Sequence, residues 1–203
     1  MIIKEIIAKS LLRKHKFVDS WFVSKYGFNI YRGCLHNCAY CDGRAEKYQV
    51  EGEFGKEIAV KINAPELLDR ELNPANKRKP LKKGYIAVGG GVGDAYQPAE
   101  AELKMSRKVL EIIAKYDFPI HILTKSDAVL NDLDIIKEIN QQTGARISFS
   151  FSSVDEKISR VFEPGVPLPK ARLAAMSELR RNERIILEIL RTGSSAYYEK
   201  MLY

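Results

Sequence analysis

The sequence predicts an α/β fold with a mainly parallel sheet. Short apolar segments typical of strands alternate with longer segments whose apolar residues recur at helical intervals. Several strand-like segments lead directly into glycines or small polar residues, as parallel strands do before the next helix. With 203 residues, 45% of them hydrophobic, the chain is long enough for one domain with a sizeable core, which we predict over residues 1–203.

Five strands are predicted along the chain. Residues 57–62 alternate apolar and polar side chains, as a half-buried strand does. Residues 85–88 are a short apolar segment that ends in glycines, which indicates a buried strand. The other strands are expected at 28–32, 120–123 and 146–151.

Helices are predicted between and after these strands, over 65–72, 98–115, 130–142 and 169–181. Pro65 suits the first position of a helix, and Gly144 ends the third helix. The second helix carries apolar residues at near-helical intervals and is expected to be amphipathic. The isoleucine pairs near the N-terminus suit one side of a short helix, and residues 184–190 fit either a sixth strand or a helix.

The chain is basic, with 33 Lys and Arg against 26 Asp and Glu, a formal net charge of +7. Such an excess favours a polyanionic partner, and nucleic acid is the candidate we predict. Part of the charge is local, because residues 77–83 hold five cations in seven residues. This segment is either a binding patch or a solvated loop, and the loop is the simpler interpretation.

The chain shows no membrane or export signal. No segment approaches the roughly 18 apolar residues of a membrane span, and the N-terminus lacks the order of a signal peptide. We therefore expect a cytoplasmic protein without a membrane partner, in a compartment where thiols stay reduced.

All three cysteines, Cys34, Cys38 and Cys41, fall within eight residues. Three thiols cannot all pair as disulfides, whereas closely spaced thiolates hold soft metals and iron–sulfur clusters well. The Cys-x3-Cys-x2-Cys spacing leaves a four-metal cluster one protein ligand short. His36 could complete a Cys3His zinc site, although a polar loop residue without a metal role is the favoured interpretation.

Polar residues and glycines follow the predicted strands and should meet at one edge of the sheet, where α/β proteins place their functional groups. Glycines there let a ligand approach the backbone closely, although a tight turn alone would also explain them. Tyr40 could be a core aromatic or could lie flat against a bound ring. The candidate ligand-binding residues are Gly90, Gly91, Asp94, Lys125 and Ser150.

The cysteine motif, with an aromatic residue before its last cysteine and placed after the first strand, resembles the radical S-adenosylmethionine superfamily. The wider sequence resembles its spore photoproduct lyase-like branch, often labelled DNA repair photolyase. The matching segments are 31–48, 60–65, 93–100, 123–126 and Glu163-Pro164 followed by Arg172-Leu173. The likeness covers about residues 26–181, so we predict an N-terminal extension over 1–25 and an atypical tail over 182–203.

The resemblance implies a [4Fe-4S] cluster on Cys34, Cys38 and Cys41, with S-adenosylmethionine chelating the fourth iron. Reduction then yields methionine and a 5′-deoxyadenosyl radical that abstracts hydrogen from a substrate. Residue by residue, Tyr40 would pack near the adenine, and Gly90, Gly91, Asp94, Lys125 and Ser150 would line the pocket. The resemblance further implies a partial, open TIM-type barrel and a reductant protein of the flavodoxin or ferredoxin type.

Two departures from the family pattern are visible. Spore photoproduct lyase returns a hydrogen atom through an additional cysteine, and with three cysteines in the cluster motif that relay cannot operate in the same form. Relatives also have a sixth strand and a further C-terminal stretch, so we expect a truncated product or a short variant with an open barrel. The remaining alternatives are a non-catalytic iron–sulfur or electron-transfer protein and a zinc-binding module.

Overall fold

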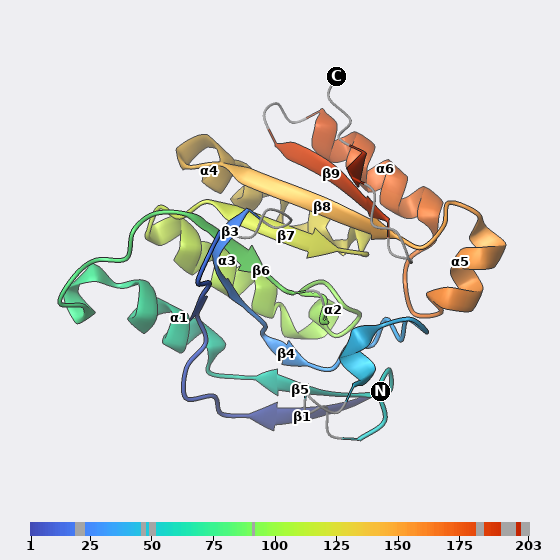
Figure 1. Ribbon diagram of the computed structural model, residues 1–203, viewed down its shortest axis with the longest axis horizontal. Coiled ribbons are helices and arrows are strands. Elements are labelled where there is room, and N and C mark those ends of the chain that lie inside the picture. The colour runs from blue at the N-terminus through green and yellow to red at the C-terminus, as the bar shows by residue number, and fades with distance from the viewer. Residues whose placement is uncertain are drawn as a thin grey trace.

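The computed structural model describes residues 1–18, 23–45, 48, 52–90, 92–181, 185–191 and 198–199, and confirms the α/β class. The main sheet has the order β10-β9-β8-β7-β6-β3-β2 and does not close on itself in the described part of the chain (Figure 1). Neighbouring strands from β3 to β9 are parallel, and β2 and β10 are antiparallel edges. The strands are β2 (Arg13–Lys14), β3 (Ser24–Phe28), β6 (Tyr85–Val88), β7 (Ile120–Thr124), β8 (Ala145–Phe151), β9 (Ile186–Arg191) and β10 (Tyr198–Glu199).

A second sheet has three strands in the order β1-β5-β4. These are β1 (Ile2–Ile6), β5 (Glu57–Lys61) and β4 (Tyr31–Arg32), with β1 parallel and β4 antiparallel to β5. The N-terminal helix prediction is therefore wrong. β-Branched isoleucines favour strands, and backbone pairing from Ile2 opposite Glu57 to Ile6 opposite Lys61 outweighs the helix-like spacing.

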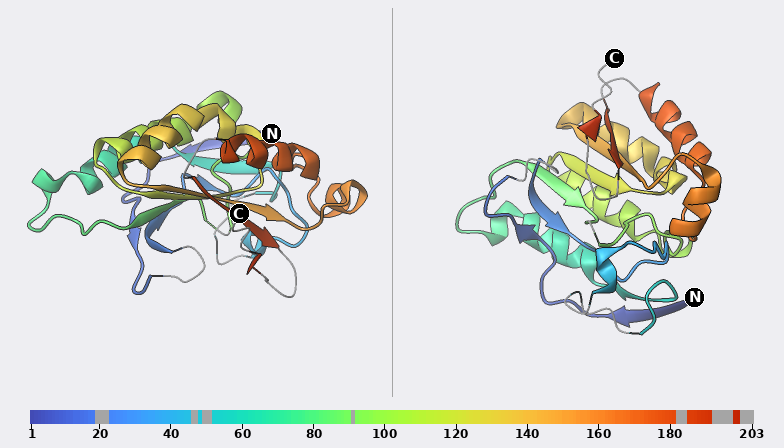
Figure 2. Two further views of the ribbon diagram at one scale, coloured as in Figure 1. Left: turned by 90° about the horizontal axis from the view of Figure 1, so that it is seen from above. Right: turned by 45° about the vertical axis from the view of Figure 1, so that its right-hand side comes forward.

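Helices cover one face of the main sheet, as Figure 2 shows for α1, α3, α4 and α6. Beneath them, the core contains Ile86, Val88, Ile122, Ile147 and Phe149, each fully buried. The helices are α1 (Ala64–Leu72), α2 (Glu100–Leu103), α3 (Met105–Lys115), α4 (Leu133–Gln142), α5 (Glu156–Phe162) and α6 (Pro169–Arg180), with short 3-10 turns η1 (Asp42–Arg44), η3 (Pro74–Asn76) and η4 (Asp127–Asp132).

Two predicted elements are interrupted in the structure, and one segment of ambiguous prediction is assigned as a strand. The strand expected at 28–32 is interrupted between β3 and β4, and the helix expected at 98–115 is broken at Lys104, whose φ is 48°. The ambiguous segment 184–190 contributes the parallel strand β9. Helix α5 was not predicted; Asp155 caps it by accepting hydrogen bonds from the N–H groups of Lys157 and Ile158.

The carboxyl ends of the parallel strands point toward the cysteine segment, and the basic segment 77–83 lies at the opposite end of the molecule (Figure 1). This arrangement separates the candidate cluster loop from the densest local run of positive charge. In the described part of the chain, no helix combines the length and the hydrophobicity that crossing a bilayer requires.

Candidate functional site

The cysteine segment follows β4 as a series of tight turns. Cys34 and Cys38 are buried and Cys41 is partly exposed, and all three thiols are free. The N–H of Asn37 donates to the carbonyl of Cys34 at 3.4 Å, and the N–H of Cys41 donates to that of Cys38 at 3.3 Å. Within the described residues, no three His, Cys, Asp or Glu side chains converge as a preformed metal site. The three thiols are therefore close in sequence, but their sulfurs do not converge on a single point in this structure.

Backbone N–H groups are directed at two of the sulfurs. Those of His36 and Asp94 donate to Cys34 Sγ, and that of Gly43 donates to Cys41 Sγ at 3.4 Å. Burial, followed by the charge of Asp94, raises the pKa of Cys34 to about 12. Burial raises the pKa of Cys38 to about 11, with Lys125 acting in the opposite direction. A bound cation is thus needed to hold these sulfurs as thiolates at neutral pH, and the N–H donors suit that form.

The loop is fastened to the segment between α5 and α6. The N–H of Ala39 donates to the carbonyl of Phe162 at 2.9 Å, and that of Gly165 donates to the carbonyl of His36 at 3.0 Å. A Cβ on Gly165 would stand 2.5 Å from the carbonyl oxygen of Leu35. Only glycine allows this close approach of two backbones, so Gly165 fixes the position of the cysteine loop.

His36 is buried and engaged at both ring nitrogens. Nδ1 lies 3.0 Å from the carbonyl oxygen of Gly165, and Nε2 lies 3.1 Å from Asp94 Oδ2. Both neighbours are hydrogen-bond acceptors, which leaves no ring nitrogen directed at the cysteines as a metal ligand. This geometry favours the polar-loop interpretation of His36 over the Cys3His zinc site.

Asp94 joins the cysteine loop to β7 rather than standing open to solvent. Its Oδ1 accepts from the N–H of Tyr96 and the hydroxyl of Thr124, both at 2.8 Å, and its Oδ2 accepts from the N–H of Lys125 at 2.7 Å. Burial opposes ionisation of this carboxyl, but His36 and the backbone donors outweigh it, so the pKa of Asp94 is lowered. Asp94 therefore links the cysteine loop to the carboxyl ends of the parallel strands, which form the rim of the main sheet.

Three predicted pocket residues, Tyr40, Lys125 and Ser150, do come together. Lys125 Nζ lies 2.6 Å from Ser150 Oγ and 5.4 Å from the centre of the Tyr40 ring. Glu163 connects them, because its Oε1 accepts from the Tyr40 hydroxyl and lies 3.2 Å from Lys125 Nζ. The Tyr40 hydroxyl also hydrogen-bonds with Cys38, which links this cluster to the thiols.

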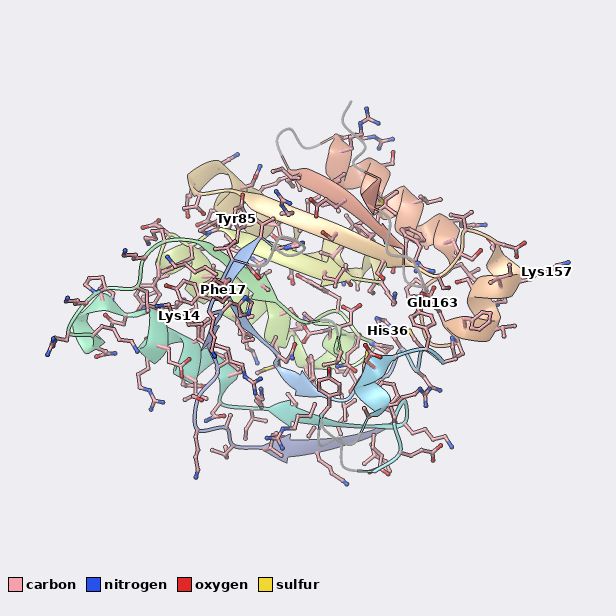
Figure 3. All side chains as sticks on the ribbon, viewed as in Figure 1. Lys14, Phe17, His36, Tyr85, Lys157 and Glu163 are labelled. Carbon is pink, nitrogen blue, oxygen red and sulfur yellow. The ribbon has the colours of Figure 1, made fainter. Side chains whose placement is uncertain are left out.

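Arg172 completes the buried cluster from helix α6. Its Nη2 lies 2.7 Å from Glu163 Oε2, and its Nη1 donates to the carbonyl of Ser150 at 2.7 Å. Both Glu163 and Arg172 were recognised as motif residues from the sequence but not as site residues. Figure 3 shows Glu163 and His36 on the same side of the molecule. Glu163 and Arg172 lie far from Lys125 in the sequence, so the sequence alone does not reveal that Glu163 contacts both Lys125 and Arg172.

The glycine segment forms a closed turn at the end of β6. Gly90 and Gly93 exchange N–H···O bonds of 3.2 Å in both directions, and Gly89 has a φ of 80°. Gly91 lies outside the described residues. A Cβ on Gly90 would meet Asn29 Oδ1 at 2.9 Å. That oxygen is buried without a hydrogen-bond partner among the described residues, so Asn29 presents an unused acceptor at the rim.

A cavity of about 840 Å³ is lined in part by His36. Its lining includes His36, Tyr96, Arg107, Asp132 and Gly165 but none of Tyr40, Lys125 and Ser150. The Tyr96 hydroxyl donates to Asp132 Oδ2 at 3.0 Å, and burial raises the pKa of Asp132. The cavity and the Lys125 cluster are thus two separate environments that share the His36 segment.

The chain is similar to two curated proteins over most of its length. The chain is 31% identical to an uncharacterized protein of Mycobacterium tuberculosis over 180 residues, covering 87% of this chain and 51% of that protein. It is 32% identical to an uncharacterized protein of Methanocaldococcus jannaschii over 160 residues, covering 78% and 56%. The chain thus spans about half the length of the curated relatives it matches.

A solved structure of the cobalamin-dependent S-adenosylmethionine radical enzyme OxsB aligns with 82% of this chain and 24% of its own, at a TM-score of 0.48 and 16% identity. The family model described as the radical SAM superfamily matches residues 28–190, a range that begins with the last residue of β3 and includes all three cysteines. Because this match covers most of the chain, the protein belongs to the radical SAM superfamily.

Proposed function

We propose that this protein is a radical SAM enzyme of the spore photoproduct lyase-like branch with a lyase-type reaction. Cys34, Cys38 and Cys41 would bind a [4Fe-4S] cluster, and S-adenosylmethionine would occupy the iron that has no protein ligand. The carrying observation is the set of backbone donors from His36, Asp94 and Gly43 directed at the sulfurs of Cys34 and Cys41. Such N–H···S bonds stabilise cluster thiolates and tune their reduction potential.

The bound cofactors would supply an electron that cleaves the sulfonium and a 5′-deoxyadenosyl radical that abstracts hydrogen from the substrate. The protein's own task is to bind, orient and exclude water. Lys125, held by Glu163 and Ser150, offers fixed N–H donors at the rim. The Tyr40 ring beside it offers a flat surface for a base, and Gly90 admits close approach of a ligand to the backbone.

Further proposals concern the protein's surroundings. Three free thiols suit a reducing compartment such as the cytoplasm, and the electron would come from a flavodoxin- or ferredoxin-type reductant. Nucleic acid is the proposed substrate class, supported by the net charge of +7. A non-catalytic iron–sulfur protein would use the same cysteines, so activity must separate the two functions.

The test is anaerobic reconstitution with iron and sulfide, reduction with dithionite, and addition of S-adenosylmethionine. The proposal predicts about four irons per chain and formation of 5′-deoxyadenosine. Four irons without that product would leave a cluster-binding protein, and a tightly held single zinc would contradict both cluster functions. The matched control is Cys41→Ala, which should lose stable cluster binding; full iron retention there would overturn the ligand assignment.

A further inference from the structure

Arg13 of β2, Arg32 of β4 and Lys61 of β5 lie close enough that the charges of both arginines act on Lys61. Arg13 of β2 lies directly across from Gly27, which in turn lies across from Ala87. Side chains of residues directly across a sheet lie on the same face. Because successive side chains of a strand alternate between faces, Ala87 lies on the face opposite to Ile86 and Val88, which are buried under the helices. Arg13 is therefore on the face of the main sheet that the helices leave uncovered.

Arg32 and Lys61 are placed on one face of the smaller sheet by the same rule. Arg32 lies across from Ala59, and Lys61 follows Ala59 by two residues in β5. The alternate residues Ile58 and Val60 are buried on the opposite face. The arginine and the lysine thus project together, away from the apolar core.

Lys61 is fixed beside the candidate site. Its Nζ donates to the carbonyl of Asn29 at 2.6 Å, and its backbone N–H donates to that of Ile30 at 3.0 Å. The side chain of Asn29 lies against Gly90, at the glycine turn of the rim. Arg32 stands two residues before Cys34. Lys61 therefore adjoins the glycine turn, and Arg32 adjoins the cysteine loop in sequence.

The charges of Arg32 and Arg13 both act on Lys61. Burial, and then the charges of Arg32 and Arg13, lower the pKa of Lys61. None of the three forms an ion pair with a carboxylate in the described part of the chain. Arg13 and Arg32 are exposed and Lys61 is half-buried. By contrast, the half-buried Arg146 pairs with Glu188 at 2.5 Å and the buried Arg172 pairs with Glu163 at 2.7 Å. Glu57, on the same strand as Lys61, pairs with Lys4.

We infer that Arg13, Arg32 and Lys61 form an anion site that receives a phosphate group of the substrate. Guanidinium groups match phosphate oxygens in paired hydrogen bonds, and an ammonium adds a compact charge. The inference names a substrate class for the function proposed above and so rests on it. The phosphate could belong to a nucleic-acid strand or to a small phosphorylated molecule. Through Lys61 and Asn29 this cluster adjoins the glycine turn at Gly90, which distinguishes it from the exposed basic residues 77–79.

The test measures binding of a short fluorescein-labelled oligothymidylate by anisotropy, with cluster-loaded protein and no reductant. Arg13→Gln, Arg32→Gln and Lys61→Gln should each weaken binding about tenfold, the loss of one charge-assisted hydrogen bond. Each should also reduce the slope of log affinity against log salt by about 0.7. The matched control, Lys77→Gln with Lys79→Gln, removes two exposed lysines of the basic segment 77–83 and should bind as wild type. Wild-type affinity in the Arg13, Arg32 and Lys61 variants, or a loss of affinity in the control equal to theirs, would overturn the inference.

Competition identifies the source of the phosphate. If thymidine monophosphate displaces the probe, a single phosphate suffices; if only unlabelled oligothymidylate does, a strand is required. Displacement by thymidine itself at the same concentration would contradict phosphate recognition. A matching loss of S-adenosylmethionine affinity in the rim variants would instead make these cations part of the cofactor pocket. Because binding is read without reductant, failure here is distinct from failure to form 5′-deoxyadenosine.

Discussion

The partly buried Lys125 and the buried Glu163 form an ion pair of 3.2 Å that joins the end of β7 to the residue following α5. The Glu163 side chain is completely buried and also pairs with the equally buried Arg172 at 2.7 Å. One carboxylate thus neutralises two cations from different elements. The pKa of Glu163 is lowered because Lys125, Tyr40 and Arg172 together outweigh the effect of burial. Several consequences of this arrangement can be measured.

Glu163→Gln should strongly destabilise the fold. It leaves the partly buried Lys125 and the buried Arg172 without their counter-ion, and breaking a buried pair such as Arg172 with Glu163 by removing one partner typically costs about 3–5 kcal/mol. Urea unfolding measures the change. The matched control is Glu178→Gln, which breaks a largely exposed pair with Arg181 and should change stability by less than about 1 kcal/mol. Equal effects of the two substitutions would show that the Glu163 cluster is not essential to the fold.

Lys125→Gln should weaken S-adenosylmethionine binding by about tenfold while leaving the iron content unchanged, because it removes a charged donor but no thiol. Titration calorimetry without reductant gives the affinity, and iron analysis gives the cluster content. Lys104→Gln, at the wall of the separate cavity, serves as the control and should bind the cofactor normally. Unchanged affinity in the Lys125 variant would remove this lysine from the proposed pocket.

Gly165→Ala should displace the cysteine loop. The added Cβ would stand 2.5 Å from the carbonyl oxygen of Leu35, and overpacking of this kind costs about 1–3 kcal/mol. We expect reduced iron retention after desalting. Gly93→Ala is the matched control, since its Cβ would find its nearest atom at 3.9 Å. If both variants keep the same iron as wild type, the close approach at Gly165 does not set the loop position.

Asp132→Asn should raise the thermal unfolding midpoint at neutral pH. Burial raises the pKa of Asp132 in the folded state, with the Tyr96 hydroxyl and Arg107 acting in the opposite direction. A carboxyl with a raised folded pKa lowers stability progressively as the pH rises from its ordinary pKa of 3.8 to its folded pKa, and the full loss remains at higher pH. The advantage of the variant should therefore grow from below pH 4 to pH 7. A constant or shrinking difference would contradict this sign.

The sequence was most informative where local patterns and structure coincide. Residues 85–88 and 57–62 were predicted as strands because their periodicity and glycine ends are local signals, and β6 and β5 confirm them. Helix α5 gave no such signal, since Val161 and Phe162 are exposed apolar residues on a short helix. The break at Lys104 was also missed, because a left-handed backbone at lysine has no signature in an otherwise amphipathic pattern.

The candidate site was predictable in its parts and not in its connections. Parallel-strand logic placed Lys125 and Ser150 at one edge, and the structure brings them within 2.6 Å. The same logic could not show that Asp94 faces inward to His36 and Thr124, because that depends on where the cysteine loop folds back. Glu163 and Arg172 likewise acquire their roles only when α6 packs against β8.

The central claim is that Cys34, Cys38 and Cys41 hold a cluster with one iron open to S-adenosylmethionine. Electron paramagnetic resonance of the dithionite-reduced, reconstituted protein tests it most directly. We predict a [4Fe-4S]⁺ signal whose g values shift when S-adenosylmethionine is added. A cluster signal that is identical with and without S-adenosylmethionine would contradict the claim.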